Sequence, residues 1–223
     1  MKVVVAVFPG TNCEIDTKYA FEKIGCDVEL VFHKTCTLPS DTDLVVLPGG
    51  FSYGDYLRSA AIAKFSPIMQ AVIDFANRGG LVLGICNGFQ MLLEAKLLPG
   101  AMKRNQNTHF ISKYQHLKVI NNNNIFLQKL EIGDILNIPI AHGEGNYFID
   151  KEKIQDLYDS EQVILEYCDK NGEKNNPNGS LSQIAGVCNK NKNVFGLMPH
   201  PERAMEELLG SDDGVKMLEG FLK

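Results

Sequence analysis

A cysteine stands between two glycines in the segment Gly84-Ile85-Cys86-Asn87-Gly88. An apolar run over 81–85 precedes it, and residues 88–97 follow with apolar positions at helical spacing. A nucleophile on a tight strand-to-helix turn flanked by glycines is the elbow of many hydrolases, here with cysteine in place of serine. The free amides and the dipole at a helix start favour the thiolate. The pattern predicts Cys86 as a nucleophile and the Asn87 amide as an oxyanion donor.

A second candidate group lies in the segment Met198-Pro199-His200-Pro201-Glu202. The two prolines stiffen the backbone, and Pro201 keeps His200 out of the helical region. In an extended backbone, residues i and i+2 share a side, so Glu202 can reach His200. A base held by a carboxylate is what a thiol nucleophile requires. We therefore expect His200 to act as the base and Glu202 to orient it.

A glycine pair, Gly49-Gly50, closes the apolar run Leu44–Leu47. Such a turn at the end of a strand can direct a backbone amide into a neighbouring site. If this strand and the one before Cys86 lie in one parallel sheet, both turns lie at the same edge. The Gly50 amide is then the second oxyanion donor.

The elements that must position these residues alternate along the first hundred positions. Strands are expected at 3–8, 28–32, 44–47 and 81–85, and helices at 13–24, 55–77 (with a break before Pro67) and 88–97. Continuous apolar strands with helical crossovers predict an open, mostly parallel, twisted sheet with helices on both faces.

The second half predicts a smaller antiparallel portion of the same α/β fold. Strands are expected at 117–120, 163–167, 184–187 and 194–197, with a closing helix at 212–222. The asparagine-rich stretches 121–124 and 171–179 are expected to be surface loops. No repeat or linker divides the chain, so one domain is expected over 1–223.

Composition restricts the classes of function. The 223 residues carry a formal net charge of −5, which argues against a nucleic-acid or anionic-membrane surface. No run approaches the ~20 apolar residues of a membrane span, and the first apolar run is too short for a signal peptide. Six cysteines without a CxxC pair favour reduced thiols in the cytoplasm, with no disulfide and no metal site.

The order of the motifs LPGG, GICNGFQ and MPHPER resembles that of class I (triad-type) glutamine amidotransferases, which have a flavodoxin-like core. The segments FPGTNCEID, GGFSYGDYLRSAAIAKFSPIM and PIAHGEGNYF narrow the resemblance to a branch that serves purine biosynthesis, and together the motifs span residues 8–204. The resemblance implies that Cys86 attacks the carboxamide of L-glutamine and forms a γ-glutamyl thioester. It implies that His200 passes the thiol proton to the departing ammonia and that Gln90 lies near bound glutamine.

The partners follow partly from what the sequence lacks. Neither G-x-x-x-x-G-K-[ST] nor G-x-G-x-x-G occurs, so no nucleotide cofactor is expected on this chain. The resemblance implies a synthetase subunit that binds ATP and magnesium and a small accessory subunit. The residues expected at the interface lie in branch-specific motifs outside the triad: Tyr53, Asp55, Tyr56, Arg58, His142, Glu144 and Cys13.

Three other readings stay open at this point. The chain could be a stand-alone cysteine hydrolase of similar fold, although some such families have histidine directly after the cysteine, where this chain has Asn87. It could be the glutaminase subunit of a different synthetase, or a glutamine sensor without catalysis. Retention of Cys86, His200 and Glu202 together argues against the sensor.

Overall fold

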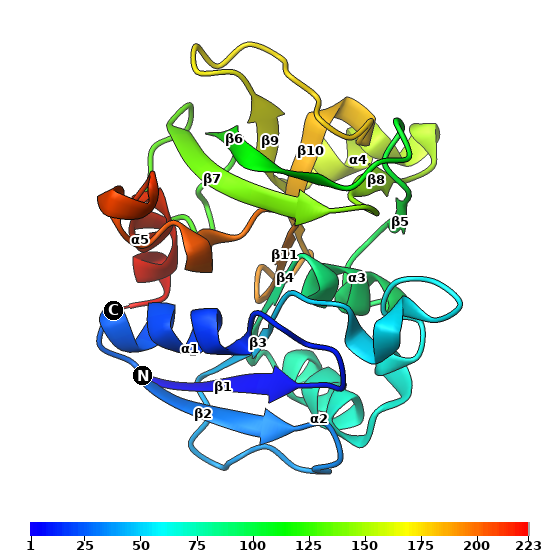
Figure 1. Cartoon of the computed structure of the whole chain (residues 1–223), viewed down its shortest axis with the longest axis vertical. Helices are drawn as coiled ribbons and strands as arrows, with labels where there is room; N and C mark the ends of the chain where they lie inside the picture. The colour runs from blue at the N-terminus through cyan, green and yellow to red at the C-terminus, as the bar shows by residue number, and fades with distance from the viewer. Residues whose placement is uncertain (223) are drawn as a thin grey trace.

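The computed structural model describes residues 1–222, and its main element is a nine-stranded sheet (Figure 1). The strands lie in the order β2 (Asp27–Phe32), β1 (Lys2–Val7), β3 (Leu44–Leu47), β4 (Leu81–Ile85), β11 (Val194–Leu197), β10 (Ile184–Cys188), β9 (Val163–Cys168), β6 (Ile111–Val119) and β7 (Ile135–His142). The pairings from β2 to β11 are parallel, and those from β11 to β7 are antiparallel. This mixed sheet has the parallel and antiparallel portions that the sequence predicts.

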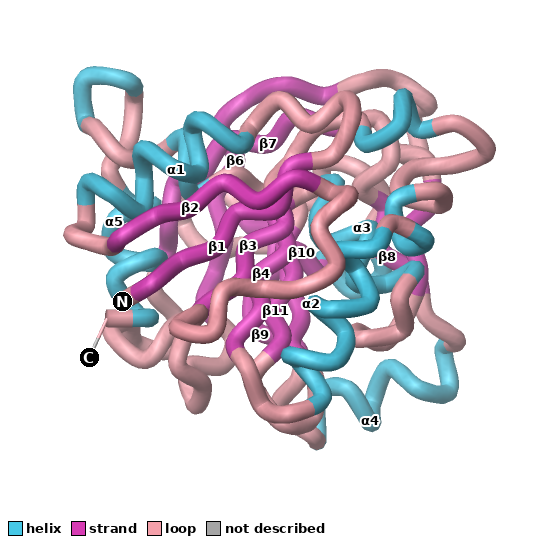
Figure 2. Tube along the Cα trace, turned by 90° about the horizontal axis from the view of Figure 1, so that it is seen from below, coloured by secondary structure: helices cyan, strands magenta, loops and turns pink. Residues whose placement is uncertain are grey.

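Helices cover both faces of the sheet, as predicted. Figure 2 shows α1 (Glu14–Lys23) and α5 (Asp213–Leu218) on one side of the strands, with α2 (Pro67–Asn77) and α3 (Asn87–Glu94) on the other. A short helix, α4 (Ile154–Asp159), precedes β9, and a small separate sheet pairs β5 (Ala101–Lys103) with β8 (Asn146–Phe148). Strands β1 and β3 are almost wholly buried, as expected for parallel strands covered on both faces. Within residues 1–222, no helix has the length and apolar character to span a bilayer.

The segment before α2 differs from the predicted long helix. Residues 52–66 contain two short 3₁₀ turns, Ser52–Asp55 and Ala63–Phe65, and the helix begins only at Pro67. Proline suits the first helical position, and it holds Ser66 in an extended conformation with ψ of 143°. The helix predicted over 55–66 is therefore wrong.

The second half contains more strand than predicted. β7 was not expected, and β6 begins at Ile111 rather than at 117. Buried and half-buried residues alternate along β7, the pattern of a strand with one face on the core. Pro139 within it obscures that pattern, and its carbonyl accepts a hydrogen bond from the amide of His200 at 2.8 Å.

The register at the centre of the sheet aligns three strand ends. Leu47 of β3 pairs with Gly84 of β4, and Leu197 of β11 pairs with Ile85. Because these strands are parallel, their carboxyl ends meet at one edge of the sheet. The three motifs that follow these strands, around residues 49, 86 and 200, are therefore neighbours in space.

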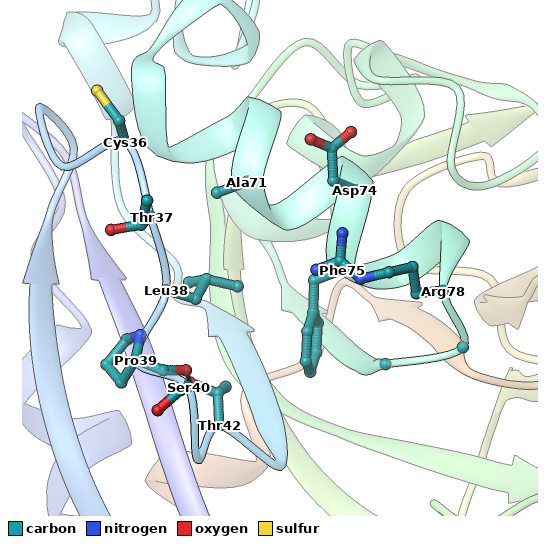
Figure 3. Close-up of a pocket in the computed structure, with 12 residues that line it drawn as sticks. Cys36, Thr37, Leu38, Pro39, Ser40, Thr42, Ala71, Asp74, Phe75 and Arg78 are labelled. Atoms are coloured by element: carbon teal, nitrogen blue, oxygen red, sulfur yellow. Dashed lines mark hydrogen bonds between the residues drawn. The ribbon is translucent and has the colours of Figure 1, made fainter.

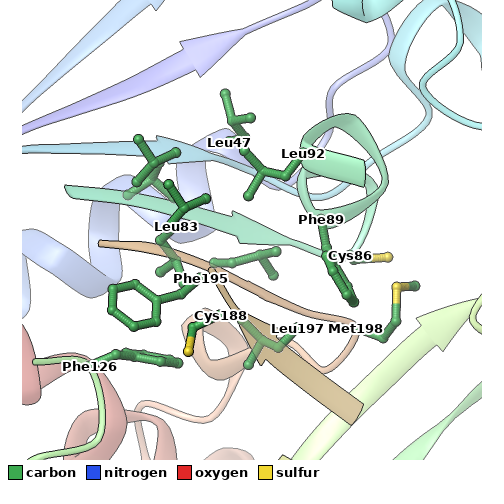
Figure 4. Close-up of a cluster of buried hydrophobic side chains, with 14 of the residues drawn as sticks. Leu47, Leu83, Cys86, Phe89, Leu92, Phe126, Cys188, Phe195, Leu197 and Met198 are labelled. Atoms are coloured by element: carbon green, nitrogen blue, oxygen red, sulfur yellow. The ribbon is translucent and has the colours of Figure 1, made fainter. Parts of the chain in front are cut away.

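Apolar packing holds the turn after β4 against the sheet. Figure 4 shows Leu83 of β4 and Phe89 and Leu92 of α3 among the buried side chains around Cys86. At Gly88, an added Cβ would lie 1.8 Å from the carbonyl oxygen of Leu47, so only glycine permits α3 to approach β3 this closely.

Candidate active site

Cys86 occupies the strained corner between β4 and α3. Its φ of 51° and ψ of −105° lie outside the regions that non-glycine residues favour. The amide of Cys86 donates to the carbonyl of Leu197 at 2.8 Å, which ties the corner to β11. The side chain is 6 % exposed, at the edge of two cavities. The corner therefore has the conformation of a nucleophile elbow.

His200 and Glu202 form a buried pair beside this corner. Nδ1 of His200 lies 2.6 Å from Oε1 of Glu202, and the two residues are 1 % and 3 % exposed. Burial lowers the pKa of His200, but the Glu202 carboxylate and then the Cys86 thiolate raise that pKa well above its usual value. Nε2 of His200 has no hydrogen-bond partner among the described residues, and His200 and Cys86 line the same cavity. The imidazole can therefore exchange a proton through Nε2 while the carboxylate holds Nδ1.

Two backbone amides are available for an oxyanion. The Asn87 amide is among the first of α3, which have no acceptor within the helix. Within residues 1–222, the Gly50 amide donates no backbone hydrogen bond. At Gly49, an added Cβ would lie 2.7 Å from Cε1 of His200, so glycine lets this turn approach the base. The arrangement suits stabilisation of a tetrahedral intermediate at Cys86.

The Asn87 side chain ties the 50–55 turn to α3. Its Oδ1 accepts from the amide of Ser52 at 3.0 Å, and its Nδ2 donates to Asp55 at 3.1 Å and to Oε1 of Gln90 at 2.8 Å. Burial raises the pKa of Asp55, although the bond from Asn87 opposes that rise. Asn87 thus has a structural role besides the one predicted for its amide.

A cavity of about 300 Å³ opens over Cys86. Its lining includes the carboxylates of Asp55 and Glu144, the guanidinium of Arg104 and the side chain of Gln90. Charges of both signs in this lining suit the ammonium and carboxylate of a free amino acid, and the volume suits a ligand the size of glutamine. Nε2 of Gln90 donates to the backbone carbonyl of Glu144 at 2.7 Å, so Gln90 also fixes the cavity wall. We name this space the substrate cavity.

Two buried asparagines that the sequence analysis did not single out hold the 142–145 wall of this cavity. Asn105 donates to the carbonyl of His142 at 2.9 Å and accepts from the amide of Gly145 at 2.9 Å. Asn178 donates to the carbonyl of Gly145 at 2.8 Å and lies 3.4 Å from Nε2 of His142. Both asparagines are 1 % exposed. Asn178 is therefore buried, although the sequence predicted a surface loop over 171–179. Nothing in the local sequence distinguishes it from its exposed neighbours.

The residues predicted at the partner interface do not form one surface. Tyr56 and Arg58 are exposed, whereas the Tyr53 hydroxyl points inward, 2.6 Å from Nδ1 of His33. Asp55 and Glu144 line the substrate cavity.

His142 does not fit the interface role. It is 3 % exposed, and burial followed by the charge of His200 lowers its pKa to about 4. The imidazole faces Asn105 and Asn178 within this chain, so His142 is left out of the docking surface proposed below.

Cys13 lies behind the catalytic pair rather than on an outer surface. The thiol is 2 % exposed, and Nη2 of Arg203 donates to its sulfur at 3.2 Å. Ligand-type atoms of Cys13, His200 and Glu202 lie within 4.8 Å of one another, as a metal site would require. The neighbouring guanidinium and the His200–Glu202 hydrogen bond favour an acid–base arrangement at this position.

A larger cavity of about 650 Å³ lies elsewhere, between residues 36–42 and the end of α2 (Figure 3). Cys36, Asp74 and Arg78 are among its lining residues, and none of the predicted site residues belongs to it. It takes no part in the arrangement around Cys86.

Comparison with known proteins agrees with this geometry. The family model for CobB/CobQ-like glutamine amidotransferase domains matches residues 1–213, and the chain belongs to this family of enzymes. It is 66 % identical over 223 residues to "Phosphoribosylformylglycinamidine synthase subunit PurQ" of Sulfurimonas denitrificans, with all of both chains covered. It is 58 % identical over 222 residues to the protein of the same name from Campylobacter jejuni, covering 100 % of this chain and 96 % of that relative.

A solved structure matches over nearly the whole chain. The structure of PurLQS from Thermotoga maritima contains a chain with a TM-score of 0.90 and 44 % identity, and the match covers 99 % of this chain and 97 % of that one. The glutamine amidotransferase class and the predicted fold are thereby confirmed.

Proposed function

We propose that this chain is the glutaminase subunit of a phosphoribosylformylglycinamidine synthase. It hydrolyses L-glutamine to glutamate and ammonia through a thioester at Cys86. The ammonia is used by a synthetase subunit that converts formylglycinamide ribonucleotide to formylglycinamidine ribonucleotide in de novo purine biosynthesis. Full-length similarity to relatives with that name supports this assignment over a subunit of another synthetase. The observation that carries the mechanism is the strained Cys86 corner beside the buried His200–Glu202 pair.

The mechanism assigns one role to each group. The sulfur of Cys86 attacks the carboxamide carbon while His200 holds the thiol proton. The amides of Gly50 and Asn87 stabilise the oxyanion. His200 then protonates the leaving ammonia as the thioester forms, and Glu202 keeps the imidazole in the required tautomer and orientation. Gln90 lies at the wall of the substrate cavity, where glutamine binds.

The test is glutamate release by the wild-type chain and by Cys86→Ala, with and without the synthetase. Cys86→Ala should abolish release and the acid-stable glutamyl adduct. Cys36→Ala is the matched control, because Cys36 is an exposed thiol that lines a different cavity. Wild-type release by Cys86→Ala would end the proposal. We expect slow release by the chain alone and faster release when the synthetase is bound.

Two other subunits complete the proposed complex. ATP and magnesium bind to the synthetase subunit, a small accessory subunit completes the assembly, and this chain forms one domain over 1–223. The PurLQS structure from Thermotoga maritima supports a complex of this kind. Six free thiols fit a reducing compartment, so the reaction is assigned to the cytoplasm.

The exposed part of the 53–58 segment is the proposed docking surface. Tyr56 and Leu57 are 75 % and 90 % exposed, an unusual display of large apolar side chains next to the substrate cavity. Tyr56→Ala combined with Leu57→Ala should weaken pull-down by the synthetase and reduce stimulation of glutamate release. Leu208→Ala, at a site 91 % exposed, is the control. Unchanged binding by the double variant would remove this surface from the interface.

A further inference from the structure

Two cavities meet at Cys86. The substrate cavity contains Gln90 and Glu144 but not His200. A second cavity, of about 240 Å³, contains His200 and Cys13 but not Gln90. Cys86 lines both spaces, so its sulfur lies where they meet. We name the second space the base cavity.

Two aromatic side chains line both cavities. Phe51 and Phe110 belong to both linings, and their ring centroids lie 6.4 Å apart. Both are about half exposed, at 47 % and 53 %, so they lie at the molecular surface. The two spaces therefore adjoin beneath this pair, and they differ in that His200 lines only the second and Gln90 only the first.

The base cavity connects solvent with the catalytic base. Its rim includes the exposed residues Asn12 and Ser112, whereas Cys13, Cys86 and His200 at its floor are buried. Its volume accommodates several water molecules, at about 30 Å³ each. Nε2 of His200 is buried and has no hydrogen-bond partner within residues 1–222, and Asn12 and Ser112 add polar side chains to the lining. The cavity thus has the polar lining that ordered water needs.

Hydrolysis of the thioester requires a water molecule beside Nε2 of His200. The glutamyl chain bonded to Cys86 occupies the substrate cavity, whereas His200 lines the base cavity and not the substrate cavity. We propose, on the basis of the function above, that the base cavity holds the deacylating water and is its route of entry. The water oxygen bonds to the thioester carbon, and its proton goes to Nε2 of His200. The carbon–sulfur bond then breaks, the proton returns to the sulfur, and glutamate leaves.

The test fills the base cavity without touching the catalytic residues. Ser112→Phe places a ring at its rim, and Ser112→Ala is the matched control. Thr108→Phe fills the substrate cavity instead, because Thr108 lines only that space. The protein, alone and in its complex, is mixed with labelled glutamine, and the covalent adduct is quantified after acid quench and followed after removal of glutamine.

We expect Ser112→Phe to lengthen the adduct lifetime about tenfold and to raise the acylated fraction at saturating glutamine. Ser112→Ala should behave as wild type, and Thr108→Phe should raise the KM for glutamine with an unchanged adduct lifetime. Asn12→Phe fills the same cavity from another lining position and replaces Ser112→Phe if that variant does not fold. If Ser112→Phe or Asn12→Phe folds and its adduct lifetime is unchanged, the base-cavity proposal is overturned and the proposed function is not. Absence of adduct from the wild type would instead reject the thioester mechanism.

Discussion

His142 should make the folded protein sensitive to mild acid. The imidazole is buried between Asn105 and Asn178 and lies close enough to His200 to feel its charge. Burial, followed by that charge, lowers the pKa of His142 to about 4 in the folded chain. The pKa of an unfolded histidine is about 6.5.

The sign and size of the effect follow from proton linkage. Because the folded pKa of His142 is depressed, the unfolded chain binds this proton more readily as pH falls. The contribution of His142 is constant above pH ~7, and stability is lost as pH falls from about 6.5 toward 4. Between pH 7 and pH 4.5, the free energy of unfolding should fall by about 2–3 kcal/mol on account of this group.

The assay is urea-induced unfolding of the wild type and of His142→Gln at pH 7 and at pH 4.5. Glutamine retains one donor and one acceptor for Asn105 and Asn178 but does not titrate. Surface carboxylates contribute similarly to the acid sensitivity of both proteins. The difference between the two losses of unfolding free energy therefore isolates the contribution of His142. The variant should lose about 2–3 kcal/mol less than the wild type on acidification. Equal losses, or a folded-state pKa of His142 near 6.5 by NMR titration, would refute the reasoning.

Three further outcomes are expected. Gly88→Ala should lower the free energy of unfolding by about 3 kcal/mol or more, because its Cβ would meet the Leu47 carbonyl at 1.8 Å. Gly143→Ala, whose Cβ meets nothing nearer than 3.8 Å, should leave thermal unfolding unchanged. Glu202→Gln should lower kcat for glutamate release by about 10²–10⁴-fold and lower the pKa of His200, measured by kinetics and by NMR. Asn178→Ala should raise the KM for glutamine and cost about 1–3 kcal/mol of stability, whereas Asn171→Ala, in the exposed part of the same loop, should do neither.

The nucleophile corner and the parallel half of the sheet were predictable because their signals are local. A strand followed by Gly-x-Cys-x-Gly determines the conformation at Cys86, and Gly88 is required by contact with a neighbouring strand. The prolines around His200 likewise set its backbone and bring Glu202 within reach. The sequence signal for each of these features lies within fewer than ten consecutive residues.

The cavity wall was not predictable because its signals are distant in the chain. Asn105 and Asn178 become buried only when β6, β7 and the loop after β9 are assembled, and nothing in their neighbours marks them. His142 belongs to a motif that resembles one of the family's motifs, but the motif does not show that the side chain points inward. Residues 55–66 have helical composition, yet backbone conformations with positive φ at Asp55, Leu57 and Ala60 replace the helix.

The pairing of β4 with β11 joins segments more than a hundred positions apart. A chain in which only the first four strands have assembled carries the thiol and an oxyanion donor, but no imidazole to accept the proton. Glutamine cleavage therefore depends on the pairing of β4 with β11. A molecule that lacks this pairing lacks the base that glutamine cleavage needs.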